Sequence, residues 1–286
     1  MILGTRLPAT SGSSSSVKSA DGTVVRVMKL DGIFESEEAR DFARSAGEIF
    51  VRRRRLSVGA SALYFDELMD VDEDRRVVAA ILSAYVASPA YRQMWTYLDR
   101  PAQAAIPLHM CLLRTVDVAH VPAHVPFHQD VAFMTEGFPS MNCWVALDDC
   151  GPGFGTPSLE VLAAPVDRRL GIVPDDQRRF VFHRNIELDL ESLRTDHAAE
   201  AFWHPDFRIG DAILFNQYAP HRTYIEQGMR GERRSLEIRL CPAAALPATA
   251  PWVPKVEVGN AGGVHEMVLV EGSGVRRLLS VVETEP

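Results

Sequence analysis

The chain has 286 residues, of which 47% are hydrophobic and 24% charged, and its formal net charge is -8. This length can bury a sizeable core, and the acidic balance gives no electrostatic reason to bind nucleic acid or an anionic membrane surface. No apolar run approaches the length of a membrane span, and the N-terminus lacks the pattern of a secretory signal. We therefore expect a globular cytoplasmic protein without nucleic-acid or membrane partners.

The first hundred residues predict an arm, one strand and several helices. Residues 1–22 are rich in Ser, Gly, Thr and Ala over their second half, which is typical of a flexible N-terminal arm. Residues 23–30 read as a strand. Apolar side chains at helical spacing predict three helices, over residues 36–51, 72–88 and 89–100.

Four consecutive arginines, at positions 52–55, follow the first of these predicted helices. We interpret them as the solvated end of that helix, with an anion contact as the alternative. Lysine is nearly absent while arginine is plentiful, so a cluster of arginines is weak evidence for a binding site in this chain. The run therefore carries no functional prediction.

The hydrophobic pattern of the sequence changes after Pro101. From about 105 to 242, short apolar runs are separated by Gly, Pro and Asp, a pattern typical of a β-sandwich or barrel. Helices followed by a β unit give an α+β, mainly β class. We expect residues 23–286 to form a single domain, with a β core over 105–242 and a C-terminal extension over 243–286 that contains a hairpin about "EGSG".

The four cysteines indicate a reducing compartment. No pair has CxxC spacing, and three of the four lie in apolar segments. Free, buried thiols are therefore expected rather than disulfides or a thiolate metal site. The four residues are Cys111, Cys143, Cys150 and Cys241.

The stretch "HVPFHQDVAF", residues 124–133, places two potential metal ligands inside an apolar segment. In an extended strand, residues two apart point to the same face, so His128 and Asp130 would project together. The third ligand is expected at a strand end downstream, and His221 in "GDAILFNQYAPHRT" is the best candidate. Two histidines and one carboxylate form the facial triad of non-haem Fe(II) oxygenases.

A pair of arginines follows that histidine at the start of another predicted strand. Arg233 and Arg234, in "RGERRSLEIRL", could present a guanidinium fork to a carboxylate. Such a fork suits the distal carboxylate of 2-oxoglutarate. Spacing alone leaves both arginines open.

Four segments, taken together, carry a resemblance to a known family: "FHQD", "MNCWVALDD", "GDAILFNQYAPHRT" and "RRSLEIRL". In order and approximate spacing they resemble the phytanoyl-CoA dioxygenase-like (PhyH-type) family of Fe(II)/2-oxoglutarate-dependent oxygenases. The resemblance covers roughly 105–242 and implies a double-stranded β-helix, a jelly-roll or cupin-like core braced by the N-terminal helices. It implies His128, Asp130 and His221 as metal ligands.

The resemblance also implies the cofactors Fe(II), 2-oxoglutarate and O2. Arg233, helped by Thr223, matches the group that holds 2-oxoglutarate. Arg234 is its alternative, because the loop between His221 and the arginines is about one residue longer than is usual in the family. Trp144 lies near the co-substrate in this comparison. A fixed carboxylate at Asp130 implies oxygen transfer or desaturation rather than halogenation.

The substrate is not readable from the sequence. Where the family often has a Pro-Gly-Ser-His element, the chain reads "SLEVLAAPVDRRLG". Candidate substrate contacts are Arg114, His124 and Phe133. We expect oxidation, most simply hydroxylation, of a C–H bond of a small-molecule metabolite, by a biosynthetic enzyme that is a monomer or homodimer. The alternatives are desaturation, epoxidation or cyclisation, or a non-catalytic metal- or ligand-binding β-barrel.

Overall fold

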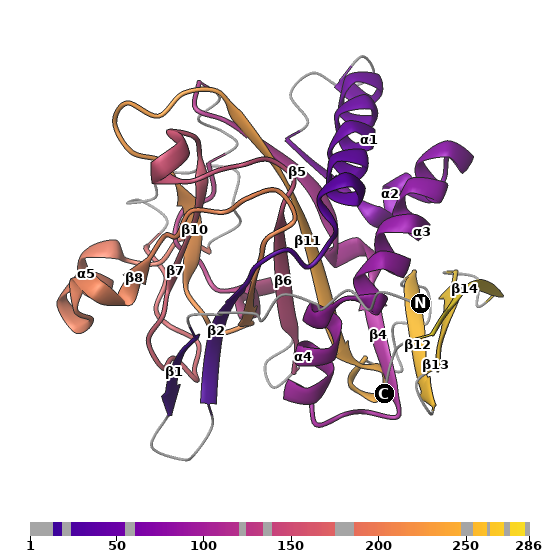
Figure 1. The fold of residues 1–286 in the computed structure, drawn as a ribbon. Helices are drawn as coiled ribbons and strands as arrows, with labels where there is room; N and C mark the ends of the chain where they lie inside the picture. Colours follow the sequence, from indigo (N-terminus) through magenta and orange to yellow (C-terminus); the bar gives the residue numbers. More distant parts are fainter. Residues whose placement is uncertain are drawn as a thin grey trace, which may run out of the picture.

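The computed structural model describes residues 14–18, 24–54, 61–119, 124–133, 139–174, 186–246, 254–261, 264–271 and 275–283. Strands dominate it, and Figure 1 shows the helices gathered mainly at one side. No helix within these ranges is long and apolar enough to cross a membrane. The helices are α1 (Ser36–Arg54), α2 (Phe65–Leu68), α3 (Asp72–Ala87), α4 (Pro89–Tyr97) and α5 (Leu190–Asp196).

The large sheet is antiparallel and runs in the order β1-β2-β9-β6-β11. Strand β11 is long, so β5 pairs with its first half and β4 with its end, and β3 pairs with β5. Through β4 the sheet continues into the C-terminal part of the chain. The strands of the large sheet up to and including β11 are β1 (Ser14–Lys18), β2 (Val24–Leu30), β3 (Ala62–Tyr64), β4 (Gln103–Pro107), β5 (Leu112–Asp117), β6 (Met141–Ala146), β9 (Ala212–Asn216) and β11 (Glu232–Pro242).

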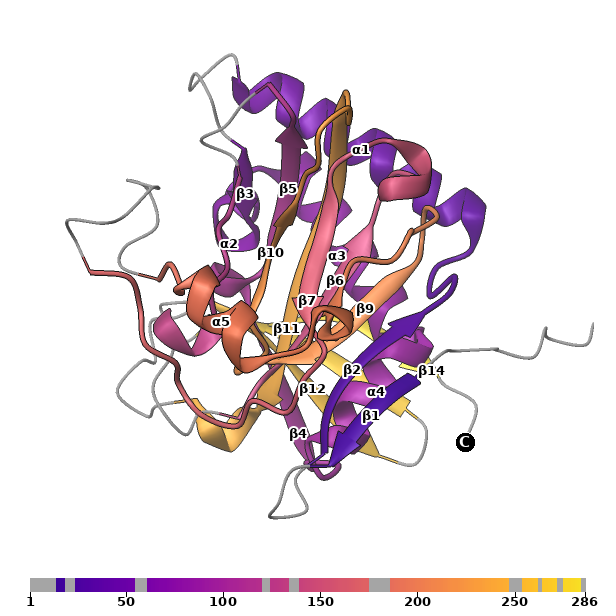
Figure 2. The ribbon, with the colours of Figure 1, turned by 90° about the vertical axis from the view of Figure 1, so that its left-hand side faces the viewer.

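A small sheet of three strands, in the order β10-β7-β8, faces the large one. In Figure 1 it lies to the left of β6 and β11, while α1, α2 and α3 lie to their right. Figure 2 looks from the small-sheet side, with β10, β7 and α5 in front of the large sheet. The strands are β7 (Ser158–Leu162), β8 (Phe202–Trp203) and β10 (His221–Tyr224).

Alternation along β11 explains why the two faces of the large sheet differ. Leu236, Ile238 and Leu240 are fully buried in the core that includes the residues of α1, α3 and α4. Successive side chains of a strand point to opposite faces, so the alternate set points toward the small sheet. That set is polar: Arg233, Ser235, Glu237 and Arg239, all at most 9% exposed.

The predicted elements of the first hundred residues are confirmed as β2, α1, α3 and α4. Within the predicted arm, residues 14–18 form β1 and pair with β2. The hairpin predicted about residues 271–274 corresponds to β13 (Val264–Val270) and β14 (Arg276–Glu283), while β12 (Lys255–Ala261), which joins it to β4, was not predicted. All four cysteines are free and buried, as expected.

Two of the four arginines at positions 52–55 are not simply solvated: Arg52 and Arg53 lie in the last turn of α1, and their contacts correct the interpretation for these two positions, while position 55 lies outside the described residues. Arg52 and Arg53 donate to the two carboxylate oxygens of Asp74 on α3, at 2.6 and 3.0 Å. The Asp74 side chain is only 2% exposed. This clamp joins two bracing helices, and an interpretation based on helix periodicity alone could not detect it.

Asp74→Ala should therefore destabilise the protein by about 1–2 kcal/mol. Removing one partner of a buried ion pair costs about 3–5 kcal/mol, but both arginines reach solvent and lose less. Urea unfolding would measure the change. Asp72→Ala is the control, because that carboxylate is 85% exposed in its pair with Arg75. Equal losses in the two variants would contradict the clamp.

Candidate metal centre

Two histidines from distant parts of the chain lie side by side at the inner face of the small sheet. The backbones of His128 and His221 form an antiparallel bridge, and each N–H donates to the other's carbonyl at 3.0 Å. Their ring centroids are 4.1 Å apart. The bridge therefore holds the two backbones side by side, so that the two imidazoles project from adjacent positions.

Asp130 completes the cluster by a route that differs from the predicted one. It does not continue an extended strand but begins a short 3-10 helix, Asp130–Phe133. Its Oδ1 lies 3.9 Å from His128 Nε2 and 3.8 Å from His221 Nε2. All three donor atoms lie within 4.8 Å of one another, and all three residues are buried.

Backbone carbonyls set the tautomer of both imidazoles. Nδ1 of His128 bonds to the Pro126 carbonyl at 2.9 Å, and Nδ1 of His221 bonds to the Ala219 carbonyl at 3.0 Å. A carbonyl oxygen can only accept, so Nδ1 donates in each ring and Nε2 is the nitrogen left to face the cluster. Burial and the neighbouring His221 lower the pKa of His128 to about 3, so this ring is neutral at physiological pH.

The carboxylate of Asp130 is held ionised. Burial acts to raise its pKa, but the guanidinium of Arg239 and the nearby histidines outweigh burial and leave the pKa below its ordinary value. Asn142 on β6 also donates to this carboxylate, at 3.1 Å. Two imidazole lone pairs and one carboxylate oxygen converging at this distance fit a divalent metal, with coordination positions left for other ligands.

Arg233 lies in the same interior, further along β11. It is 1% exposed, its guanidinium lies over the Trp144 ring at 5.0 Å, and it donates to the Ser235 hydroxyl. Within the described part of the chain, no carboxylate pairs with it, and neither its Nε nor Trp144 Nε1 has a hydrogen-bond partner. Burial lowers the pKa of Arg233 to about 10. A buried cation in this state can be neutralised by an anionic ligand.

Arg234 points the other way. Its Nε and Nη2 donate to both oxygens of Asp148, at 2.9 and 2.5 Å, and its Nη1 donates to the Ala43 carbonyl on α1. Alternation along β11 therefore places Arg233 in the interior and Arg234 against the helices. The structure distinguishes the positions of the two arginines, which spacing had left open.

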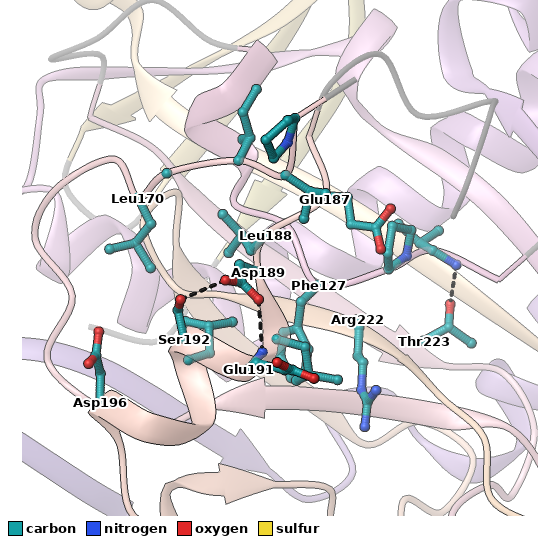
Figure 3. Close-up of a pocket in the computed structure, with 18 of the residues that line it drawn as sticks. Phe127, Leu170, Glu187, Leu188, Asp189, Glu191, Ser192, Asp196, Arg222 and Thr223 are labelled. Carbon is teal, nitrogen blue, oxygen red and sulfur yellow. Dashed lines mark hydrogen bonds between the residues drawn. The ribbon is translucent and has the colours of Figure 1, made fainter. Parts of the chain in front are cut away.

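Thr223 lies two residues beyond His221 on β10, and its hydroxyl accepts from the Val125 N–H at 3.0 Å. It lines a cavity of about 890 Å³ between β10, the 124–127 segment and residues 170–174 and 187–196. Figure 3 shows Thr223 with Phe127, Arg222 and several acidic side chains around this cavity. His124 also lines it and bonds to the Asp117 carbonyl at 3.0 Å. None of the three clustered residues, His128, Asp130 and His221, lines this cavity.

The other two candidate substrate contacts lie nearer the cluster. Phe133 is 50% exposed, and its ring centroid is 6.1 Å from that of His128. Arg114 on β5 is opposite Ser235, so it shares the interior face, and its Nε donates to Glu237 at 2.8 Å. Arg114 is therefore paired with an acidic neighbour in the structure.

Sequence reasoning missed Arg239 and Asn142, both of which contact Asp130. A signal was available in "RRSLEIRL", where polar and apolar residues alternate from Ser235 to Leu240. A period of two places Arg239 on the same face as Arg233, with Arg234 opposite. The alternation marks a strand whose interior face is charged, which is itself unusual for a buried position.

No family model and no curated protein matches the sequence, so the family resemblance stays a prediction. The fold does match solved structures. The non-heme alpha-ketoglutarate-dependent carbocyclase SnoK from nogalamycin biosynthesis is 12% identical with a TM-score of 0.50, over 76% of this chain and 80% of that one. AviO1 from Streptomyces viridochromogenes Tue57 is 16% identical, with a TM-score of 0.49 over 78% and 92%. The non-heme monooxygenase ThoJ is 15% identical, with a TM-score of 0.49 over 90% and 84%.

At such low identity the likeness to SnoK establishes the fold alone. Two facing antiparallel sheets enclose the polar face of β11, and helices cover the outer face of the large sheet. The predicted fold class is confirmed by this arrangement and this likeness. The chain is a mainly β protein with a jelly-roll, double-stranded β-helix core and N-terminal bracing helices.

Proposed function

We propose that the protein is a non-haem Fe(II)/2-oxoglutarate-dependent oxygenase acting on a small-molecule metabolite. The observation that carries the proposal is the convergence of His128, Asp130 and His221 in the same interior that holds Arg233, with which no carboxylate of the described residues pairs. When bound, Fe(II) supplies activation of O2 with oxidative decarboxylation of 2-oxoglutarate. The likeness in fold to SnoK, a non-heme alpha-ketoglutarate-dependent enzyme, supports the same class.

The residues of the chain would divide the work between holding the metal and holding the co-substrate. The Nε2 atoms of His128 and His221 and Oδ1 of Asp130 would bind the ion. Arg233 would neutralise the distal carboxylate of 2-oxoglutarate, and Thr223 would donate its hydroxyl proton to the same group. Trp144, stacked on Arg233, would form an apolar wall and offer its unpartnered N–H.

The specific outcome is proposed as hydroxylation of a C–H bond, with desaturation, epoxidation and cyclisation as the competing outcomes of the same class. SnoK is a carbocyclase, so a ring closure is compatible with this fold. Asp130 fills a metal position with a carboxylate, which argues against halogenation. Phe133 and Arg114 would border the substrate, and His124 would contribute from the neighbouring cavity. We propose residues 23–286 as one domain, monomeric or homodimeric and cytoplasmic.

Purified protein loaded with Fe(II) should release succinate from 2-oxoglutarate, and a true substrate should increase the release. A non-catalytic metal- or ligand-binding barrel would bind metal without releasing succinate, and that result would contradict the proposal. Mass spectrometry of the product formed under 18O2 in excess chloride separates the outcomes. One added 18O indicates hydroxylation, or epoxidation where the substrate has a double bond that is lost; a loss of two mass units indicates desaturation or cyclisation, and a chlorinated product would overturn the role given to Asp130.

A further inference from the structure

A buried guanidinium lies directly behind the candidate metal ligand Asp130. Arg239, 5% exposed, donates from Nη2 to Asp130 Oδ1 at 2.9 Å and from Nε to Asp130 Oδ2 at 3.1 Å. This is the two-pronged geometry in which a guanidinium fixes both oxygens of a carboxylate. Asn142 adds a second donor to Oδ2, at 3.1 Å.

The two oxygens of Asp130 are therefore not equivalent. Oδ2 accepts from Arg239 and from Asn142, which occupies its lone pairs. Oδ1 accepts once and is the atom that faces both imidazole Nε2 atoms. A carboxylate held in this way can present one oxygen to a metal but cannot rotate to present both.

Arg239 is itself held in place. Its Nη1 donates to the Met110 carbonyl, its backbone N–H donates to Cys111 Sγ at 3.3 Å, and Glu237 lies 3.7 Å from its Nη2. Glu237 in turn accepts from Arg114. A row of alternating charges thus connects Asp130 to the inner face of β5, so the guanidinium has little freedom to move.

We propose that Arg239, assisted by Asn142, is a positioning residue that presents Asp130 to the metal through Oδ1 alone. The inference rests on the proposed metal centre. One oxygen uses one coordination position, so the remaining positions stay open for a two-pronged co-substrate and for O2. The guanidinium charge opposes the metal charge, while the fixed carboxylate favours binding. Residues that hold metal ligands in place typically contribute 10- to 100-fold in metal affinity, so we expect the favourable effect of the fixed carboxylate to exceed the charge repulsion.

Anaerobic titration with Co(II) alone tests the proposal without turnover, because its absorption spectrum reports the number and geometry of its ligands. Arg239→Gln should weaken Co(II) binding about 10- to 100-fold and change the spectrum as Asp130 becomes free to bind through both oxygens. Arg239→Lys keeps the charge but not the fork, so its affinity should be intermediate. Asn142→Ala should weaken binding by a smaller factor and serves if Arg239→Gln fails to fold.

Arg234→Gln is the matched control, because it breaks a two-pronged pair with Asp148 on the opposite face of the same strand. It should lower the melting temperature and leave the Co(II) affinity and spectrum unchanged. Folded Arg239→Gln or Asn142→Ala with wild-type affinity and spectrum, or with tighter binding, would overturn the positioning role. Wild-type protein that binds no Co(II) would instead overturn the metal centre itself.

Discussion

His221→Ala should abolish stabilisation of the protein by Fe(II) or Co(II). Wild-type protein at a metal concentration 100 times its dissociation constant gains about 2.7 kcal/mol, which appears as a raised melting temperature. The variant keeps two of the three donors but loses the imidazole that the backbone bridge holds 4.1 Å from His128. We expect no metal-dependent shift in its anaerobic melting curve and no succinate release.

A control histidine just beyond β8, a strand of the same small sheet, separates ligand loss from damage to the fold. His204 stacks on Tyr224 at 4.2 Å and lies 3.3 Å from Glu160, outside the cluster of three donors. His204→Ala should keep the full metal-dependent shift even if its metal-free melting temperature falls. If both variants lose the shift, or if neither does, the site is not the one defined by His128, Asp130 and His221.

The three side chains of the candidate cluster could be singled out from the sequence because each lies in a short, chemically unusual segment. A histidine and an aspartate two apart within apolar surroundings, and a histidine after a strand, are local signals. Their meeting is not local, since it depends on the bridge between residues 128 and 221. The 3-10 turn at Asp130 was also hidden, because the two-residue spacing fits an extended strand equally well.

Helices were easier to predict than their contacts. Periodicity located α1, α3 and α4 to within a few residues, because amphipathic spacing is a local property. It could not show that Asp74 is buried by Arg52 and Arg53, since an aspartate in a first helical turn usually faces solvent. Strand β12 was missed although it also pairs with the next strand, β13; only its pairing with β4, about 150 residues earlier, is a contact that no local pattern identifies.

Alternation along β11 places Arg233 and Arg234 on opposite faces of the sheet, so we expect their substitution to affect the KM for 2-oxoglutarate very differently. Arg233→Met should raise the KM for 2-oxoglutarate about 10- to 100-fold, because hydrogen bonds to charged groups contribute about 1.5–3 kcal/mol. Steady-state succinate release at varied 2-oxoglutarate measures this directly. The matched variant Arg234→Met removes a guanidinium from the opposite face and should leave that KM within about twofold, as expected for a residue with no contact to the ligand.

The melting temperature of the ligand-free protein should rise in Arg233→Met and fall in Arg234→Met. Arg233 is a buried cation that no carboxylate pairs with in the described chain, so methionine at 233 relieves a desolvation cost and should raise the melting temperature of the ligand-free protein. Arg234 neutralises Asp148 with two hydrogen bonds, so Arg234→Met should lower the melting temperature. If Arg233→Met instead lowers the melting temperature of the ligand-free protein and leaves the KM unchanged, Arg233 is structural and another group binds 2-oxoglutarate.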